Sequence, residues 1–304
     1  MIRRRAAGLL VPLAGLLVLT GCATFDENDD AAVVQGTAIT RQEYQDFLTL
    51  LASEPELSRL VVDDETDTVA GGDGRQWLTY LVSTTLSATY LAEAGITVTD
   101  ADRQTVLDSI PEDEALRDVP ELLDTVVEAQ AALAARERVA APSTSEIEQR
   151  YNESPASLGV ICARHIVVAT AAEADDVLVE LDQGADFAGL AAERSTDPAA
   201  AENGGVLTDG GGDCIARSAL GQVPELVVAA DEAGVGVPTR PVESSAGWHI
   251  LLQRPYDEVG EALDTLFEQQ AGALLFDAYA AQADVQIDPR YGRWDSPTRA
   301  VVAL

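Results

Sequence analysis

A change of periodicity at Val160 most constrains the fold of this chain. Before that residue, apolar side chains recur at helical spacing, whereas residues 160–168 and 247–253 are apolar β-rich runs. After Pro255 the helical spacing returns over a long stretch. The apolar stripe of this last helix needs a partner, and the helices before residue 157 are the natural one. The sequence therefore predicts an α+β fold in which a mixed segment is inserted into a helical frame.

The start of the chain has the features of an export signal. A basic segment over residues 1–5 precedes an apolar run over residues 6–18, which is too short to span a bilayer as a helix. Small residues then lead to Cys22, and this pattern resembles the lipobox of bacterial lipoproteins. The resemblance implies a signal peptide over residues 1–21, lipidation of Cys22, an acidic tether over residues 22–30 and an extracytoplasmic, membrane-anchored location. The alternative is an ordinary secretory signal with a chance cysteine.

The charge of the chain excludes several classes of function. There are 52 acidic residues against 19 basic ones, which gives a formal net charge of −33, and every basic residue is an arginine. A chain without lysine cannot form a Schiff base or use the lysine of a phosphate-binding loop. Phosphate backbones would repel so acidic a protein, so no nucleic-acid partner is expected.

Two cysteines remain if Cys22 is lipidated. Cys162 and Cys214 would then lie in an oxidising compartment, where an even number of thiols favours one disulfide. Cys162 could instead be a nucleophile with His165 as its base, but side chains three residues apart on a strand point to opposite faces. The disulfide is therefore the favoured interpretation.

Only two histidines occur, and both lie in apolar β-runs. Neighbouring strands could place His165 and His249 face to face. A single strand histidine more often fills a core or surface position than a functional one. A metal site formed by these two residues and Asp197 has suitable ligand types, but no two of the three are close in sequence. Neither a metal nor a cofactor is expected.

Six short motifs indicate that the two histidines are functional rather than ordinary strand residues. In chain order they are residues 164–168 (RHIVV), 184–191 (GADFAGLA), 195–197 (STD), 204–207 (GGVL), 223–226 (VPEL) and 244–250 (SSAGWHI). Together they resemble the parvulin family of peptidyl-prolyl cis/trans isomerases over about residues 158–256. The flanks are similar to extracytoplasmic foldases of the SurA and PrsA type, which open with a hairpin like that of residues 34–40.

This resemblance implies both an organisation and an activity. It implies a helical chaperone-like domain over residues 31–157, an inserted parvulin domain over residues 158–256 with a small antiparallel-rich sheet, and a C-terminal helix and tail over residues 257–304 that pack on the first domain. The implied activity is cis/trans isomerisation of Xaa-Pro bonds in unfolded or partly folded exported polypeptides, without a covalent intermediate.

Family positions also imply roles for single residues. His165 and His249 correspond to a central histidine pair that orients the polar network. Asp197 corresponds to the polar group that faces the substrate carbonyl, and Ser244 to the hydroxyl that supports the pair.

The proline pocket is expected from Leu207, Val223 and Leu226. The sequence departs from the family at one pocket position and at two positions of a glycine-rich turn, namely Gln222, Val206 and Thr208. These departures favour an alternative function, a holdase chaperone that keeps the parvulin fold with little or no turnover. No basic cluster follows the first histidine to pair with a phosphate, so specificity for phosphorylated substrates is not expected.

Overall fold

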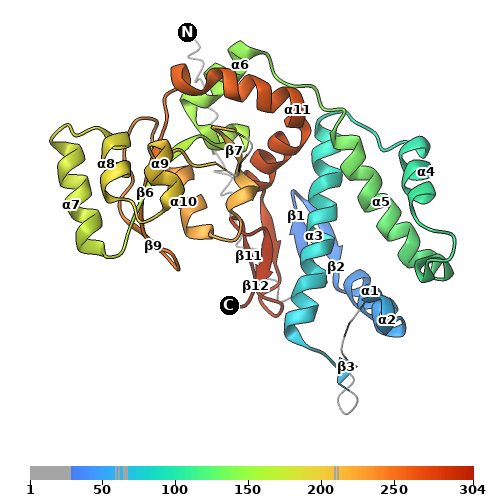
Figure 1. The fold of residues 1–304 in the computed structure, drawn as a ribbon. Coiled ribbons are helices and arrows are strands. Elements are labelled where there is room, and N and C mark those ends of the chain that lie inside the picture. Colours follow the sequence, from blue (N-terminus) through green and yellow to red (C-terminus); the bar gives the residue numbers. More distant parts are fainter. Residues whose placement is uncertain (1–28, 59, 61, 64–67, 209, 211) are drawn as a thin grey trace, which may run out of the picture.

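The computed structural model describes residues 29–304 except 59, 61, 64–67, 209 and 211 (Figure 1). The expected signal peptide, Cys22 and most of the expected tether lie outside the described residues. Within the described part, no helix combines the length and the apolar character that crossing a membrane requires.

A helical frame forms the first part of the molecule. Its elements in chain order are β1 (Asp30–Val34), β2 (Thr37–Thr40), α1 (Arg41–Ser53), α2 (Pro55–Ser58), β3 (Val62–Asp63), β4 (Thr68–Val69), α3 (Gly71–Glu93), α4 (Asp100–Ser109), η2 (Ala115–Asp118), α5 (Pro120–Arg136) and α6 (Thr144–Glu153). The expected hairpin is present, with Gln35 and Gly36 both at positive φ in its two-residue turn. A capping box of Thr40 and Glu43, a pattern that the sequence shows directly after the hairpin, opens α1.

The insert follows, and its sheet is small. Its elements are η3 (Pro155–Leu158), β5 (Val160–Ile161), β6 (Ala163–Val168), α7 (Ala171–Asp182), α8 (Phe187–Arg194), α9 (Pro198–Asn203), β7 (Ile215–Ala216), η4 (Arg217–Leu220), α10 (Pro224–Glu232), β8 (Val242–Ser244) and β9 (Gly247–Gln253). The antiparallel sheet has the order β6-β9-β8.

The two faces of this sheet pack against different parts of the insert. Ile166 and Ile250 lie on one face, in a core with α7 and α8. Ala163 and Leu251 lie on the other face, in a core with α10. Because side chains alternate along a strand, the other odd-numbered residues of β6 and β9 also lie on this second face. Both histidines, His165 and His249, are among them.

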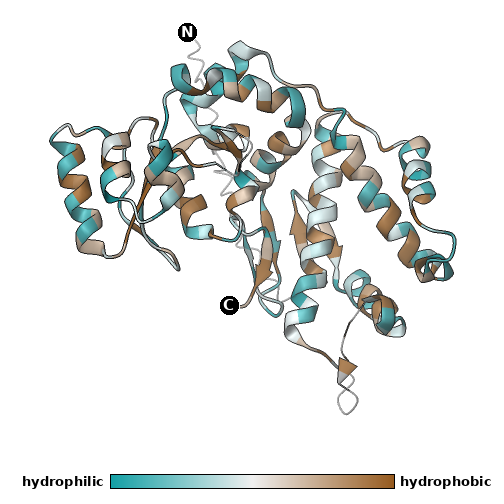
Figure 2. Ribbon diagram, in the orientation of Figure 1, coloured by the Kyte–Doolittle hydropathy of each residue, from teal (hydrophilic) through white to brown (hydrophobic). Residues whose placement is uncertain are grey.

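The chain then returns to the frame through α11 (Tyr256–Gln282), followed by β10 (Val285–Ile287), β11 (Arg293–Asp295) and β12 (Ala300–Val302). The early part of α11 packs on α6 through Leu263 and Phe267, and its later part reaches the core of α3 and α5 through Phe276. Teal and brown alternate along α5 and α11 in Figure 2, as expected for helices with one buried face. The last helix therefore finds its partners in the frame, as the sequence predicts.

Both ends of the chain complete the frame. β10 pairs antiparallel with β1, so that Val285 lies opposite Val34. The backbone N–H of Val301 in β12 donates to Thr79 Oγ1 in α3 at 2.8 Å. The carboxylate of Asp277 in α11 accepts from the N–H of Ser218 in the insert and from Arg299 in the tail. This one buried side chain joins α11, the insert and the tail.

The structure differs from three local predictions. The polar, glycine-rich composition of residues 63–74 predicts a loop, but α3 begins at Gly71, where its packing outweighs the low helix propensity of glycine. The apolar pattern of residues 237–242 predicts a strand, but only an isolated bridge and the first residue of β8 form there, because two prolines remove ladder donors. The glycines of residues 195–213 predict a loop, but this segment contains α9, which Asp197 caps.

Candidate active site

The two histidines lie side by side on one face of the insert sheet. His165 in β6 is opposite Leu251 in β9, and His249 in β9 is opposite Val167 in β6. The histidines are therefore diagonal neighbours on the same face, with ring centroids 6.1 Å apart and ring planes inclined by 23°. Both residues are more than nine-tenths buried. The structure thus brings together two residues that are distant in sequence.

A short loop places a carboxylate beside the first histidine. The N–H of Thr196 donates to the carbonyl of Val167 at 2.7 Å, and the N–H of Val167 donates to Ser195 Oγ at 3.2 Å. These bonds hold the loop against β6, so that Asp197 Oδ2 lies 3.2 Å from His165 Nε2. The other carboxylate oxygen accepts from the N–H of Ala199 at the start of α9. The Asp197 carboxylate is therefore oriented from two directions.

The second histidine has a hydroxyl partner. Ser244 Oγ lies 2.7 Å from His249 Nε2 and accepts from the N–H of Ala246 at 3.0 Å. Ser244 pairs with Gly247 across a two-residue turn, and this turn carries the hydroxyl back over β9. Gly247 has a φ of 133°, and a Cβ there would lie 2.5 Å from the carbonyl oxygen of Val168. The turn therefore needs glycine to keep the hairpin close to β6.

The environment favours the neutral form of both imidazoles. Burial lowers the pKa of His165, and the Asp197 carboxylate offsets part of this effect. Burial also lowers the pKa of His249, and the neighbouring His165 lowers it further. The Nδ1 atoms of both rings are buried and have no hydrogen-bond partner among the described residues. Two neutral imidazoles thus occupy a site with little exposure to water.

The leucines expected in the proline pocket belong to one apolar cluster beside the histidines. Leu207 and Leu226 are buried in this cluster together with Leu251, and Val223 packs on it while half-buried. Leu251 lies directly opposite His165, so the cluster borders the histidine pair. The structure therefore groups three of the four expected substrate-binding residues, whereas Gln222 is exposed and lies outside the cluster.

The glycine-rich turn keeps its backbone pairing despite Val206 and Thr208. The N–H of His165 donates to the carbonyl of Gly205, and the N–H of Leu207 donates to the carbonyl of Ala163 at 2.9 Å. A Cβ on Gly205 would lie 2.8 Å from the His165 carbonyl oxygen, and its φ is +84°. Gly205 is therefore required for the close approach to β6, and the two departures from the family leave this approach intact.

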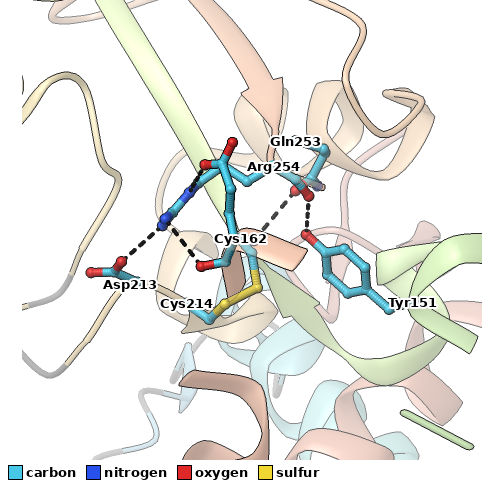
Figure 3. Close-up of a disulfide and its surroundings, with 7 residues drawn as sticks. Tyr151, Cys162, Asp213, Cys214, Gln253 and Arg254 are labelled. Atoms are coloured by element: carbon cyan, nitrogen blue, oxygen red, sulfur yellow. Dashed lines mark hydrogen bonds and ion pairs between the residues drawn. A yellow bond between two sulfur atoms is a disulfide. The ribbon is translucent and has the colours of Figure 1, made fainter. Parts of the chain in front are cut away.

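A disulfide lies at the start of β6 (Figure 3). The Sγ atoms of Cys162 and Cys214 are bonded, and the Cα atoms are 4.2 Å apart. The carbonyl of Cys162 accepts from the N–H of Arg254, whose guanidinium donates to Asp213 at 3.0 Å. Tyr151 Oη donates to the Arg254 carbonyl at 2.7 Å. These contacts attach the glycine-rich loop before Cys214 to the strand that carries His165.

Sequence reasoning missed two contributors to the site. Ser195 was part of a recognised motif but was given no role, although its hydroxyl also accepts from the N–H of Asp197. Leu251 was treated only as an apolar strand residue. Both could have been found from strand alternation and from the short distance in sequence between Ser195 and Asp197.

Comparison with known proteins connects this geometry to a family. The family model named Rotamase, the PPIC-type PPIASE domain, matches residues 166–254. The foldase protein PrsA of Caldanaerobacter subterraneus subsp. tengcongensis is 28% identical over 285 residues, which are 86% of this chain and 88% of that protein. PrsA of Halalkalibacterium halodurans is 37% identical over 166 residues, 51% of this chain and 47% of that protein. The chain thus spans most of the first relative and about half of the second.

One solved structure is similar in extent. The crystal structure of PrsA from Bacillus subtilis covers 85% of this chain and 95% of its own, at 19% sequence identity and a TM-score of 0.30.

Proposed function

We propose that this chain, which carries a PPIC-type peptidyl-prolyl isomerase domain of the parvulin family, is a foldase that catalyses cis/trans rotation about Xaa-Pro bonds in exported polypeptides. One observation carries the proposal. Two buried imidazoles lie side by side, one beside a carboxylate and the other beside a hydroxyl, next to an apolar cluster. The relatives named PrsA foldase support the same activity.

The reaction requires stabilisation of a twisted amide. Rotation about an Xaa-Pro bond passes through a state in which the amide loses its resonance, and the uncatalysed step takes tens to hundreds of seconds. A site accelerates rotation when it binds the twisted amide more tightly than either planar form. No bond is made or broken, so the site needs positioned polar groups and an apolar surface for the proline ring.

The site residues fit these two requirements. The apolar cluster of Leu207, Val223 and Leu226 supplies the surface for the proline ring, and the half-buried Val223 is the member open to substrate. Asp197, with one-third of its side chain exposed, faces the rotating carbonyl and so acts on the amide directly. Neutral His165 holds this carboxylate in place, and Ser244 holds His249 beside His165. Because both imidazoles are buried, their polar contacts are stronger than they would be in water.

The rate of exchange between cis and trans forms of a short Xaa-Pro peptide tests this function. Proline-exchange NMR or a protease-coupled assay at pH 7.5 measures it directly. We expect Asp197→Asn to lower kcat/KM by about tenfold or more, because it removes the charge that faces the rotating amide. His249→Ala should lower it by a similar factor, because it removes half of the pair that positions this network. Ser245→Ala is the matched control, because Ser245 is exposed in the same turn. Its rate should equal that of the unchanged protein.

The same assay separates the isomerase from a holdase chaperone. Equal rates in the unchanged protein and in both site variants would contradict the isomerase function. If aggregation of an unfolded client is still suppressed in that case, the protein is a holdase and its frame carries the function.

Two further parts of the proposal concern location and organisation. We infer that Cys22 is lipidated, that the chain acts outside the cytoplasmic membrane, and that residues 31–157, 158–256 and 257–304 form the frame domain, the isomerase domain and the returning C-terminal segment. The basic and apolar start of the sequence supports the first two points. Membrane fractionation and intact mass test them. Cys22→Ala should release the protein into the soluble fraction and remove the mass of the lipid.

A further inference from the structure

A cavity of about 1310 Å³ lies in the frame, where α3, α5 and α11 meet, and none of the proposed site residues lines it. Pockets for small molecules usually have volumes of about 300–1,000 Å³. The space therefore suits a segment of polypeptide better than a single compact ligand.

Much of the cavity lining is apolar. Leu86 and Leu91 from α3 and Ala132 from α5 are buried side chains that face it. Leu133, also in the lining, is 45% exposed, so this part of the apolar lining is open to water. Covering it with apolar side chains of a ligand is favourable.

One guanidinium in the lining forms no ion pair among the described residues. Arg136, at the end of α5, lies over the Phe276 ring with Cζ 4.1 Å from the ring centroid. Burial lowers the pKa of Arg136 and the nearby Arg299 adds to this effect, whereas the Asp277 carboxylate opposes it. The other two guanidinium groups of the lining are paired, Arg103 with Glu128 and Arg299 with Asp277. In a chain with a net charge of −33, an unpaired cation facing a cavity indicates an anionic ligand.

One hydroxyl in the lining is also without a partner. Ser87 in α3 is 6% exposed, and its Oγ has no hydrogen-bond partner among the described residues. A buried hydroxyl without a partner destabilises the folded state, and a ligand that hydrogen-bonds to it removes this cost. Ser87 lines the same cavity as Arg136. The cavity therefore offers a cation without an ion-pair partner and a buried hydroxyl, beside the apolar side chains of α3 and α5.

We propose that this cavity binds the C-terminal end of an apolar polypeptide, with the terminal carboxylate on the Arg136 guanidinium and a backbone group on the Ser87 hydroxyl. A guanidinium presents two parallel N–H donors that match a carboxylate. The last side chains of the polypeptide then cover the exposed Leu133. The inference rests on the proposed foldase function, since a foldase meets unfolded chains with free ends. It adds a specificity that does not depend on proline.

Fluorescence anisotropy with one labelled peptide in two forms tests the proposal. The peptide has eight apolar residues and no proline, carries the dye at its N-terminus and ends in a carboxylate or in an amide. We expect the purified protein to bind the acid about tenfold more tightly than the amide, which corresponds to one charge-assisted hydrogen bond. Arg136→Gln should abolish this preference, and Arg136→Lys should retain part of it. Arg103→Gln is the matched control, since Arg103 is already paired, and should keep the preference.

Several results would overturn the proposal. The first is that the unchanged protein binds the acid and the amide forms of the peptide with equal affinity. The second is that Arg136→Gln keeps the full preference for the acid. The third is that a saturated fatty acid of similar length binds as tightly as the peptide. If Arg136→Gln does not fold by circular dichroism, Arg136→Lys and Ser87→Ala decide, and Ser87→Ala should weaken both forms equally. Isomerase activity on a short prolyl peptide should be unchanged in all these variants. A protein without isomerase activity that keeps the acid preference would contradict the proposed catalysis but not this site.

Discussion

The sheets of the frame and of the insert take their strands from different parts of the chain. The sheet of the frame joins β1 to β10, which come from opposite ends of the chain, and the tail contacts α3 through Val301 and Thr79. The main sheet of the insert is formed by β6, β8 and β9, which all lie between residues 163 and 253. The main sheet of the insert therefore needs only the insert's own residues, whereas the sheet of the frame needs both ends of the chain. The start of the insert shares a core with α6 and α11, away from this sheet. The two sheets should therefore fail separately.

The strongest test of this difference is a substitution that disrupts the frame alone. A Cβ at Gly272 in α11 would lie 1.9 Å from the carbonyl oxygen of Arg136 in α5. Gly272→Ala should destabilise the frame by about 3 kcal/mol or more, because backbone atoms cannot yield as side chains do. Hydrogen exchange followed by mass spectrometry should show loss of protection in β1 and α3 with protection of β6 and β9 retained. Gly72→Ala is the control, since nothing lies within 4 Å of the position of its Cβ. Loss of protection in both regions would contradict the idea that the two sheets unfold independently.

The disulfide provides the opposite test, because both of its cysteines belong to the insert. The bond joins Cys162 and Cys214, which are 52 positions apart in the sequence. Loss of this constraint on the unfolded chain costs about 4 kcal/mol in the loop-entropy model. The double variant Cys162→Ser and Cys214→Ser should therefore lower the melting temperature of the insert more than that of the frame. Intact mass before and after reduction and alkylation shows whether the bond is present in the purified protein; two free thiols before reduction would contradict this prediction.

A glycine next to the histidines should affect activity more than stability. Gly205 has a φ of +84°, and its Cβ position is 2.8 Å from the His165 carbonyl oxygen. Gly205→Ala should push the glycine-rich turn away from β6, cost about 1–3 kcal/mol of insert stability and lower kcat/KM. Gly184→Ala has a similarly positive φ but open space around it, and so controls for backbone strain. An equal loss of activity in both variants would show that the contact with β6 is not the cause.

The smallest expected effect is a dependence of insert stability on pH. Burial lowers the pKa values of His165 and His249 below 6.5 in the folded state. The unfolded chain then binds more protons between those lower values and about 6.5. Stability from these residues is fully present above pH 6.5 and is lost as the pH falls through that window. The melting temperature of the insert should decrease from pH 7 to pH 5, and it should decrease less in the double variant His165→Asn and His249→Asn; equal slopes would contradict the assignment.

Sequence alone could predict the elements of the insert that carry the site. The histidines lie in strands with strong β patterns, and strand alternation then decides which side chains share a face. Asp197 could be placed because Ser195 and Thr196 form a short loop of recognisable composition. Gln222 could not be placed, because one position in a turn before α10 can point to solvent or to the cluster with little change in backbone. Only the packing of the whole insert decides between them.

The short C-terminal strands of the frame could not be predicted in the same way. β10, β11 and β12 have three residues each, and such short runs have almost no periodic signal. Their pairing depends on residues far away in sequence, as the register of Val34 with Val285 shows. The start of α3 at Gly71 was missed for a similar reason, since Tyr44 Oη donates to the Gly74 carbonyl and fixes a turn that propensity disfavours. Long-range contacts outweigh local preference at these places.

The pairing of β1 with β10 also sets an order of events whenever the chain emerges from its N-terminus, as it does during synthesis. A polypeptide that is threaded from its N-terminus delivers β1 first and its partner strand near the end. The entire insert emerges in the interval, and a self-contained sheet can form as soon as its residues are outside. The insert, with its candidate active site, would then be folded before β10 completes the sheet of the frame.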